Sequence, residues 1–260
     1  MHCKNCNHPL SENQNYCDNC GAKVIRNRLE PKVLIHQVNE QFLSIDNKLL
    51  RTFVALCVKP EDVIGGYING TRRKYIDVLQ YFAVSLTLAG FQAFLMLTFF
   101  KEQLELSNEM MNTLQNAPGN ENNPFSSFSL ADYMQYQGFV YIATLPISVL
   151  STWLTYYIIG DRRLNFTEHI VLNIYYSSQV IIVTAILSIV FMLFNLNFFI
   201  VSLVITLPTF IYLGFVLKRV FNDGFWDAFA KWMLIVVIYG IFYFVVMIII
   251  TLIPFLMRLQ

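Results

Sequence analysis

The chain has 260 residues, of which 56% are hydrophobic and only 13% are charged, and its formal net charge is +1. A soluble domain has roughly 25% charged residues, so this chain has too few charges for a water-exposed surface of ordinary size. The composition excludes a disordered chain, a strongly basic nucleic-acid-coating protein and an ordinary soluble enzyme. It is the composition of an integral membrane protein.

Cysteines are concentrated at the N-terminus, where four of the five form two Cys-x-x-Cys pairs: Cys3, Cys6, Cys17 and Cys20. The segment lacks the apolar core and cleavage site of a signal peptide, so we expect it to lie in the reducing cytosol. Cysteines there bind metal more often than they form disulfides. Four thiolates favour zinc, with iron as the alternative metal. A complete set of protein ligands leaves no position for water, so the zinc is expected to be structural.

The chain divides into a zinc ribbon with a basic linker (1–30), cytosolic amphipathic or interfacial helices (31–74) and a transmembrane domain (75–260). Apolar residues in the second part recur every three or four positions and define one helical face. They are Leu34, Val38, Phe42, Ile45, Leu49, Phe53 and Leu56. This face rests either on an anionic inner leaflet or on the chain's own transmembrane bundle. The linker has basic residues without interleaved aromatics, which favours lipid headgroups over nucleic acid as its partner.

Five apolar stretches follow, at 75–100, 139–159, 170–194, 198–217 and 233–257. Each is long enough for the about 20 residues that a transmembrane helix needs. Only 195–197 separate the third stretch from the fourth, which predicts a tight antiparallel hairpin. The fold class is therefore an all-α integral membrane protein with five transmembrane helices and a small N-terminal cytosolic zinc ribbon.

The positions of the basic residues predict the orientation. If the five helices alternate, all but Lys101 and Arg258 of the 18 Lys and Arg residues lie on one side. The positive-inside rule then places the N-terminus in the cytoplasm and the C-terminus outside the cell inner membrane. The outer loop 101–138 has a polar middle at 116–124, which we expect to be mobile. Residues 125–134 are either a short helix at the outer interface or a plain connector.

A motif precedes the first span. Pro60 suits the first position of a helix, and Gly70 ends that helix. Arg72, Arg73 and Lys74, followed by Tyr75, are expected to hold the start of the first span at the inner interface. Together with Tyr67, these residues resemble the signature of a bacterial membrane family, domain of unknown function 3667. The resemblance extends to the N-terminal cysteines and several spans, and it implies no particular activity.

The third stretch is the most polar. Glu168 and His169 lie at its start, and His169, Asn173 and Ser177 share one helical face. This face either lines the cytosolic half of a cavity or provides hydrogen bonds between helices. In the family that the chain resembles, a Glu-His pair here is often followed by further histidines. Tyr175 and Ser177 stand at those later positions, which argues against a metal or proton-relay role.

Two further residues carry predictions. Asp77 is the only ionised residue within the five stretches, and it lies four positions after Arg73, which predicts an ion pair. Cys57 is expected to be a small buried hydrophobe.

No set of nucleophile, base and orienting group is evident in the sequence, and no glycine-rich phosphate loop. We therefore interpret the chain as a non-enzymatic scaffold or adaptor whose ribbon recruits a membrane or cytosolic protein partner. The alternative is a permease or lipid-handling protein that uses the polar face of the third span.

Overall fold

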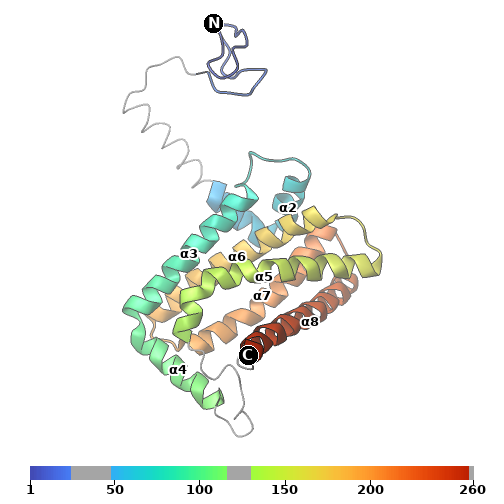
Figure 1. Ribbon diagram of the computed structural model, residues 1–260. Coiled ribbons are helices and arrows are strands. Elements are labelled where there is room, and N and C mark those ends of the chain that lie inside the picture. Colours follow the sequence, from blue (N-terminus) through green and yellow to red (C-terminus); the bar gives the residue numbers. More distant parts are fainter. Residues whose placement is uncertain (25–47, 116–129, 258–260) are drawn as a thin grey trace. The chain divides into compact units, whose positions relative to one another are not determined.

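The computed structural model describes residues 1–24, 48–115 and 130–257 (Figure 1). The chain divides into two compact units, Met1–Asp46 and Asn47–Gln260. The first contains the paired cysteines, and the second contains the long helices. The second unit begins at Asn47 rather than at residue 75, so it includes the short helices before the first span. The predicted face at Leu34, Val38, Phe42 and Ile45 lies outside the described residues.

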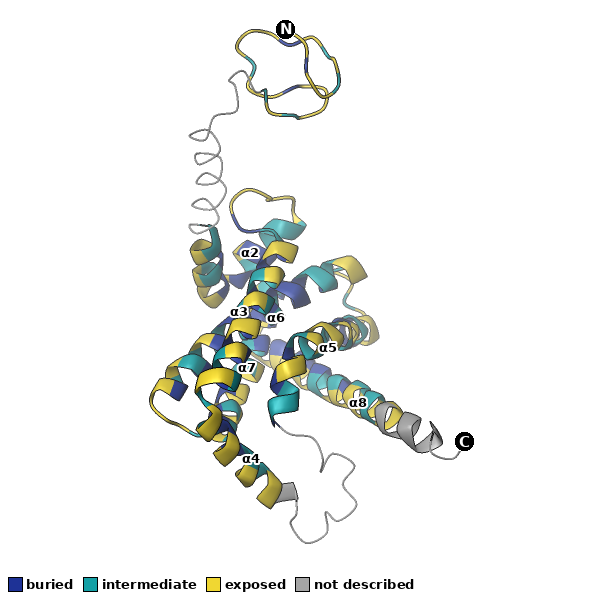
Figure 2. Ribbon diagram, turned by 60° about the vertical axis from the view of Figure 1, so that its left-hand side comes forward, coloured by how far each residue is buried: buried dark blue, intermediate teal, exposed yellow. Residues whose placement is uncertain are grey.

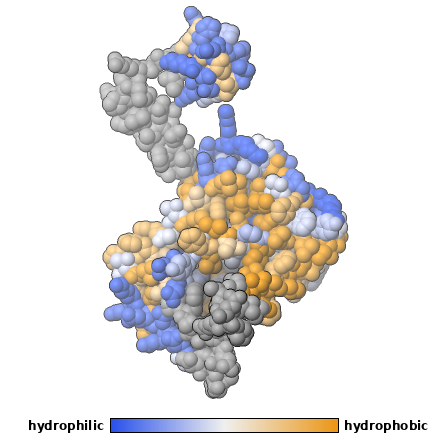
Figure 3. All heavy atoms as spheres, viewed as in Figure 1, coloured by the Kyte–Doolittle hydropathy of each residue, from blue (hydrophilic) through white to orange (hydrophobic). Residues whose placement is uncertain are grey.

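Five helices of the second unit are long and apolar enough to cross a membrane, which confirms the predicted number of spans. They are α3 (Val78–Phe99), α5 (Leu130–Ile159), α6 (Phe166–Leu193), α7 (Phe198–Phe221) and α8 (Phe225–Met257). Figure 3 shows apolar side chains over much of the visible face of this unit. Such a surface suits hydrocarbon rather than water.

Consecutive spans alternate in direction. Arg163, which follows α5, forms an ion pair with Asp223, which follows α7. At the other end, Gln103, which follows α3, donates to Asn195 in the turn between α6 and α7 at 2.8 Å. Asn195 has a φ of 55° and Asn197 caps α7, so the short hairpin is formed as predicted. We call the end that carries Arg163 and Asp223 the basic end.

Several spans begin elsewhere than the apolar stretches suggest. α5 begins at Leu130 rather than at 139, because Leu130 and Met134 are buried in an apolar cluster. The interfacial helix predicted at 125–134 is therefore wrong for its last residues, which belong to α5, and its first residues lie outside the described part. The polar run 116–124 also lies outside it.

The other spans also differ from the apolar stretches, because one begins at a helix cap and three extend beyond the apolar residues. α3 begins at Val78 because the Asp77 carboxylate accepts the Leu79 N–H at 3.0 Å. α6 begins at Phe166, four residues before the apolar stretch, and α7 continues to Phe221 instead of ending at 217. α8 begins at Phe225 instead of 233, which places Lys231 inside the helix rather than in a loop.

The helix α4 (Lys101–Gln115) was not predicted from the sequence, because most of its residues are polar. Leu104 and Ser107 face the bundle and are buried. The Ser107 hydroxyl accepts the Phe198 N–H at 3.1 Å, which ties α4 to the start of α7. The spacing of Leu104, Ser107 and Met111 was the available signal for this helix.

Two short helices pack on the basic end of the bundle. Residues 48–58 are helical, and α2 (Pro60–Ile68) follows. Leu56 of the first and Val63 and Ile64 of the second are fully buried, so this part of the amphipathic segment packs on the chain's own bundle. On the other face of residues 48–58, three apolar side chains are exposed: Leu50, Val54 and Val58.

α8 is the least buried span. Only 6% of its most apolar window is buried, compared with 28–39% in the other four spans. Figure 2 shows α8 mainly in the colours of exposed and intermediate residues. Much of the surface of Phe225–Ile249 is therefore available to lipid.

Candidate functional site

The N-terminal unit consists of two knuckles with the same backbone structure. The Cys3 N–H donates to the His8 carbonyl, and the Cys17 N–H donates to the Ala22 carbonyl, both at 2.9 Å. Asn7 and Gly21 occupy equivalent positions with φ of 58° and 69°. Only glycine adopts this region freely, and asparagine is the residue that next best tolerates it. The turn therefore favours glycine after the fourth cysteine, with asparagine as the alternative that the first knuckle uses.

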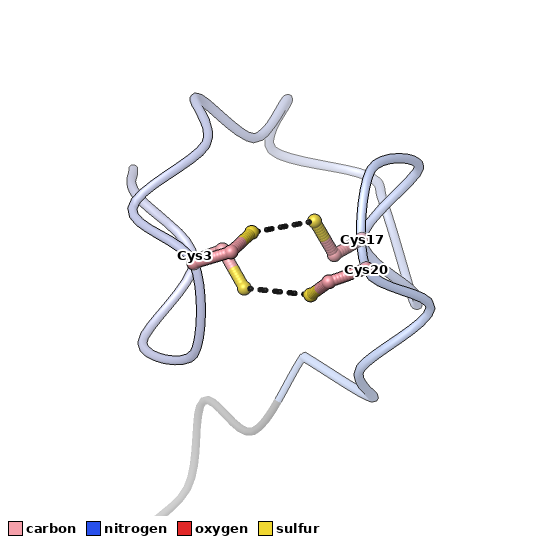
Figure 4. Close-up of side chains that lie close together, drawn as sticks. Cys3, Cys17 and Cys20 are labelled. Carbon is pink, nitrogen blue, oxygen red and sulfur yellow. Dashed lines mark hydrogen bonds between the residues drawn. The ribbon is translucent and has the colours of Figure 1, made fainter.

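The two knuckles bring their four sulfur atoms together. The Sγ atoms of Cys3 and Cys20 are 3.7 Å apart, and those of Cys6 and Cys17 are 3.6 Å apart. All four lie within 4.8 Å of one another (Figure 4). Zn–S bonds of about 2.3 Å in a tetrahedron separate the sulfurs by about 3.8 Å. The cysteines are free thiols at distances that fit a metal.

Neighbouring groups perturb the thiols and add a second layer of contacts. The backbone N–H of Ala22 is the largest cause that lowers the pKa of the Cys20 thiol to about 6. The amide of Asn19 donates to Cys6 Sγ at 3.8 Å. His2 lies 3.2 Å from the Asn7 carbonyl, and His8 lies 3.5 Å from the Asp18 carboxylate. The histidines are thus neighbours of the cysteine cluster rather than members of it.

The motif before the first span forms a folded corner at the basic end. Pro60 is the first residue of α2, and Gly70, with a φ of 94°, follows its C-cap. The Tyr67 hydroxyl donates to the Asp77 carboxylate at 3.1 Å, and the Arg72 guanidinium stacks 3.7 Å over the Tyr67 ring. Burial, helped by the Asp77 charge, raises the pKa of Tyr67, so the phenol remains a donor.

The other basic residues of the motif are exposed. Arg73 and Lys74 point away from the described core, with the Lys74 ammonium 5.0 Å from the ring centroid of buried Tyr75. The predicted ion pair between Arg73 and Asp77 is wrong: within the described residues, Asp77 bonds to Tyr67 and caps α3 instead.

Hydrogen bonds from α6 and α7 hold this corner on the bundle. The Tyr175 hydroxyl donates to the Ile76 carbonyl at 2.8 Å, and the Tyr212 hydroxyl donates to the Leu56 carbonyl at 3.0 Å. Gln179 accepts from the Tyr81 hydroxyl and donates to Cys57 Sγ at 3.0 Å. Cys57 itself is exposed, so its predicted burial is wrong.

The polar residues of α6 have separate roles. Glu168 completes a capping box with Asn165. Asn173 is fully buried, accepts from the Ser148 hydroxyl at 2.6 Å and donates to Thr152 at 2.7 Å, so it joins α6 to α5. Ser177 is half-buried on the same helix. For Asn173, this is the interhelical hydrogen bonding that was one of the two interpretations of this face.

The side chain of His169 takes no part in the hydrogen bonds that join α6 to α5. It is fully buried, and its ring centroid lies 5.4 Å from that of Tyr156 and 6.0 Å from that of Phe221. Neither of its ring nitrogens has a hydrogen-bond partner in the part of the chain that the structure describes.

An ionic cluster of Asp161, Arg163, Asp223 and Lys231 was not predicted. The Lys231 ammonium lies 3.0 Å from Asp161 and 2.6 Å from Asp223, and Arg163 pairs with both carboxylates. The hydrogen bond from Arg163 is the largest cause that lowers the pKa of Asp161. The cluster joins the residues after α5 and α7 to α8. Asp161 and Asp223, each of which comes within a few residues of the end of an apolar stretch, were the available signal.

These observations define the class. The chain is a multi-pass membrane protein with five apolar helices and an N-terminal unit whose four cysteines can hold a metal ion.

Comparison with known families agrees with this class. Residues 2–24 match a zinc-ribbon domain, and residues 46–90 match the family described as Protein of unknown function (DUF3667). The second match covers the short helices, the folded corner and the first part of α3, so it confirms the resemblance seen in the motif. No curated protein and no solved structure matches the chain.

Proposed function

We propose that this chain is a non-enzymatic adaptor of the cell inner membrane, whose zinc ribbon recruits a protein partner on the cytosolic side. The observation that carries the proposal is the closed set of four sulfur atoms, because such a set leaves a metal no open position for catalysis. The use of Asn173 in helix packing, rather than in a transport path, supports the same reading.

The zinc is structural in this proposal. Within residues 1–24, the buried apolar core consists of Cys3, Leu10 and Cys17. So small a core cannot offset the conformational entropy of folding. Zinc binding then supplies the folding free energy and fixes the surface that the partner contacts.

The basic end faces the cytosol in this proposal. Arg72, Arg73 and Lys74 are exposed there, and so are the apolar Leu50, Val54 and Val58 of residues 48–58. This combination suits the interface of a leaflet with anionic headgroups.

Copurification tests the adaptor role. Full-length protein is extracted in detergent, and its partners are identified by mass spectrometry for the wild type and for Cys3→Ser/Cys6→Ser. Cys57→Ser is the matched control, since it removes an exposed thiol outside the cluster. We expect one or more partners to be lost only from the double variant. An unchanged set of partners would contradict the proposal.

Reporter fusions test the orientation. A reporter that is active only outside the cytoplasm should be active at Asn120 and at the C-terminus, and inactive at the N-terminus. The reverse pattern would place the ribbon outside.

A second candidate function is a permease or lipid-handling protein. A cavity of ≈ 350 Å³ between α3, α5, α6 and α7 favours it. Uncharged polar side chains line this cavity, among them Gln92, Gln137 and Thr184. The side-chain amide oxygen of Gln137 (Oε1) is buried and has no hydrogen-bond partner among the described residues. The polar path would then run past Thr184 and Ser188 rather than along His169 and Asn173. Solute flux into vesicles that contain wild type or Thr184→Val/Ser188→Ala distinguishes this function, and equal flux excludes it.

A further inference from the structure

A cavity of ≈ 270 Å³ lies at the basic end, where α5 ends and α6 begins. Aromatic rings form its walls. The Trp153 ring centroid lies 5.3 Å from that of Tyr157 and 5.5 Å from that of Phe166, which stands edge-on to it. Flat surfaces of this kind favour a flat guest, which can stack or pack edge-on against them.

Two polar side chains that line this cavity lack partners. Tyr156 is 1% exposed and His169 is 0% exposed. In the described residues, the Tyr156 hydroxyl and both nitrogens of His169 are buried without a hydrogen bond. A buried polar group without a partner is costly, so such groups mark places where a ligand or ordered water completes the bonding.

The two side chains are held in place by their surroundings. The Tyr156 ring stacks on Phe221 with 4.0 Å between centroids. The His169 ring packs against the same two rings, with its centroid 5.4 Å from that of Tyr156 and 6.0 Å from that of Phe221. Their donors are therefore preorganised, which reduces the entropy lost when a ligand binds.

The charges around the cavity favour an uncharged ligand. The Asp161 carboxylate lines it and opposes an anion, and its oxygens already pair with Arg163 and Lys231. Arg162 also lines it, with its guanidinium 3.7 Å over the Tyr157 ring, and opposes a cation. A neutral phenol and a neutral imidazole each present one donor, which suits a ligand with acceptor oxygens.

The cavity also adjoins a lipid-accessible surface. Phe166, which lines it, is 43% exposed, and Ile158 and Ile159 at the end of α5 are 61% and 47% exposed. An apolar ligand can therefore arrive from the bilayer.

We propose that this cavity binds a flat, uncharged, membrane-soluble ring with carbonyl acceptors, the chemistry of a quinone headgroup. The Tyr156 hydroxyl and a ring N–H of His169 donate to its carbonyl oxygens, and the aromatic walls contact its faces. The inference is independent of the adaptor role, because the cavity lies within the helical unit.

Binding of decylubiquinone to the full-length protein in detergent tests the proposal. Quenching of tryptophan fluorescence reports it, since Trp153 forms a wall of the cavity. We expect saturable quenching that is largely lost in Trp153→Phe. Tyr156→Phe removes one hydrogen bond and should weaken the affinity about 2- to 12-fold. His169→Phe should have an effect of similar size.

Tyr176→Phe is the matched control, because its hydroxyl bonds to the Thr209 carbonyl away from the cavity. The affinity of Tyr176→Phe for decylubiquinone should equal that of the wild type. Tyr156→Phe removes a hydroxyl without a described partner, so the melting temperature of this variant without quinone should not fall below that of the wild type. A weaker affinity for quinone then reports the lost hydrogen bond rather than a loss of fold. Non-saturable quenching of the wild type, or wild-type affinity in both Tyr156→Phe and His169→Phe, would overturn the proposal.

Discussion

Asn7 and Gly21 show how one backbone requirement is met by two residue types. Both have positive φ in equivalent turns of the two knuckles. A Cβ on Gly21 would meet nothing within 4 Å, so the cost of any substitution there comes from the backbone conformation and not from a clash.

Gly21→Ala should therefore weaken zinc binding by about 1–2 kcal/mol, or roughly 5- to 30-fold in affinity. Competition with a chromophoric chelator, using full-length protein in detergent, measures the change. Asn7→Gly is the matched control and should bind zinc at least as tightly as the wild type. Equal affinities for all three proteins would show that these turns do not limit metal binding.

Tyr175 is the residue that joins α6 to the start of the first span. Tyr175→Phe should lower the free energy of unfolding by about 1–3 kcal/mol, because the buried Ile76 carbonyl loses its side-chain donor. Thermal unfolding in detergent measures this. Tyr157→Phe, at a ring that is 49% exposed, should change stability little, and a similar loss in both variants would contradict the assignment.

The ionic cluster acts between elements, since it joins the residues that follow α5 and α7 to α8. Its side chains are mostly buried: Lys231 is 11% exposed, Asp161 12% and Asp223 8%. Removing one partner of a buried pair leaves the opposite charge without compensation.

Lys231→Met should cost about 3–5 kcal/mol of stability, because both carboxylates then depend on Arg163 alone. Lys218→Met is the control at an exposed lysine without an ion pair among the described residues. Thermal unfolding of the two variants should separate them clearly, and a stable Lys231→Met protein would show that the cluster contributes little.

The cluster also predicts a dependence on pH. Arg163 and Lys231 lower the pKa of Asp161 in the folded protein below the ordinary value of about 3.9. The contribution of Asp161 is then complete above about pH 4 and is lost as the pH falls below that value. Between pH 6 and pH 2.5 the melting temperature of the wild type should fall further than that of Asp161→Asn. Any effect of pH on the ribbon is the same in both proteins and cancels in this comparison. An equal fall in melting temperature for wild type and Asp161→Asn would contradict the assignment.

At the scale of the whole molecule, the two compact units differ in what stabilises them. The helical unit has extensive buried contacts, whereas the described part of the N-terminal unit, residues 1–24, has a very small core. Removal of zinc by a chelator should therefore unfold the ribbon and leave the melting temperature of the helices unchanged. Faster tryptic cleavage at Lys4 and Lys23, together with an unchanged circular dichroism melt, is the expected result. Joint unfolding of both units would contradict their independence.

The sequence predicted the features that depend on local pattern. Cysteine spacing predicted the cluster, apolar length predicted five spans, and Pro60 and Gly70 predicted the bounds of α2. It did not reveal α4, whose buried face is only Leu104, Ser107 and a few neighbours. It also missed the ionic cluster, because Asp161 is 70 residues from Lys231 and meets it only when the spans alternate. The pairing of Asp77 with Tyr67 instead of Arg73 likewise depends on how α2 turns back onto α3.

The attachment of α8 has a consequence for how the protein is made. Few residues of Phe225–Ile249 are fully buried, yet Lys231 in this helix pairs with two carboxylates contributed by earlier parts of the chain. Without α8, Arg163 would be the one described cation paired with both Asp161 and Asp223, which leaves one negative charge uncompensated. Docking of α8 brings Lys231 to these carboxylates, so its two ion pairs favour closing of the assembly once α5 and α7 are in place.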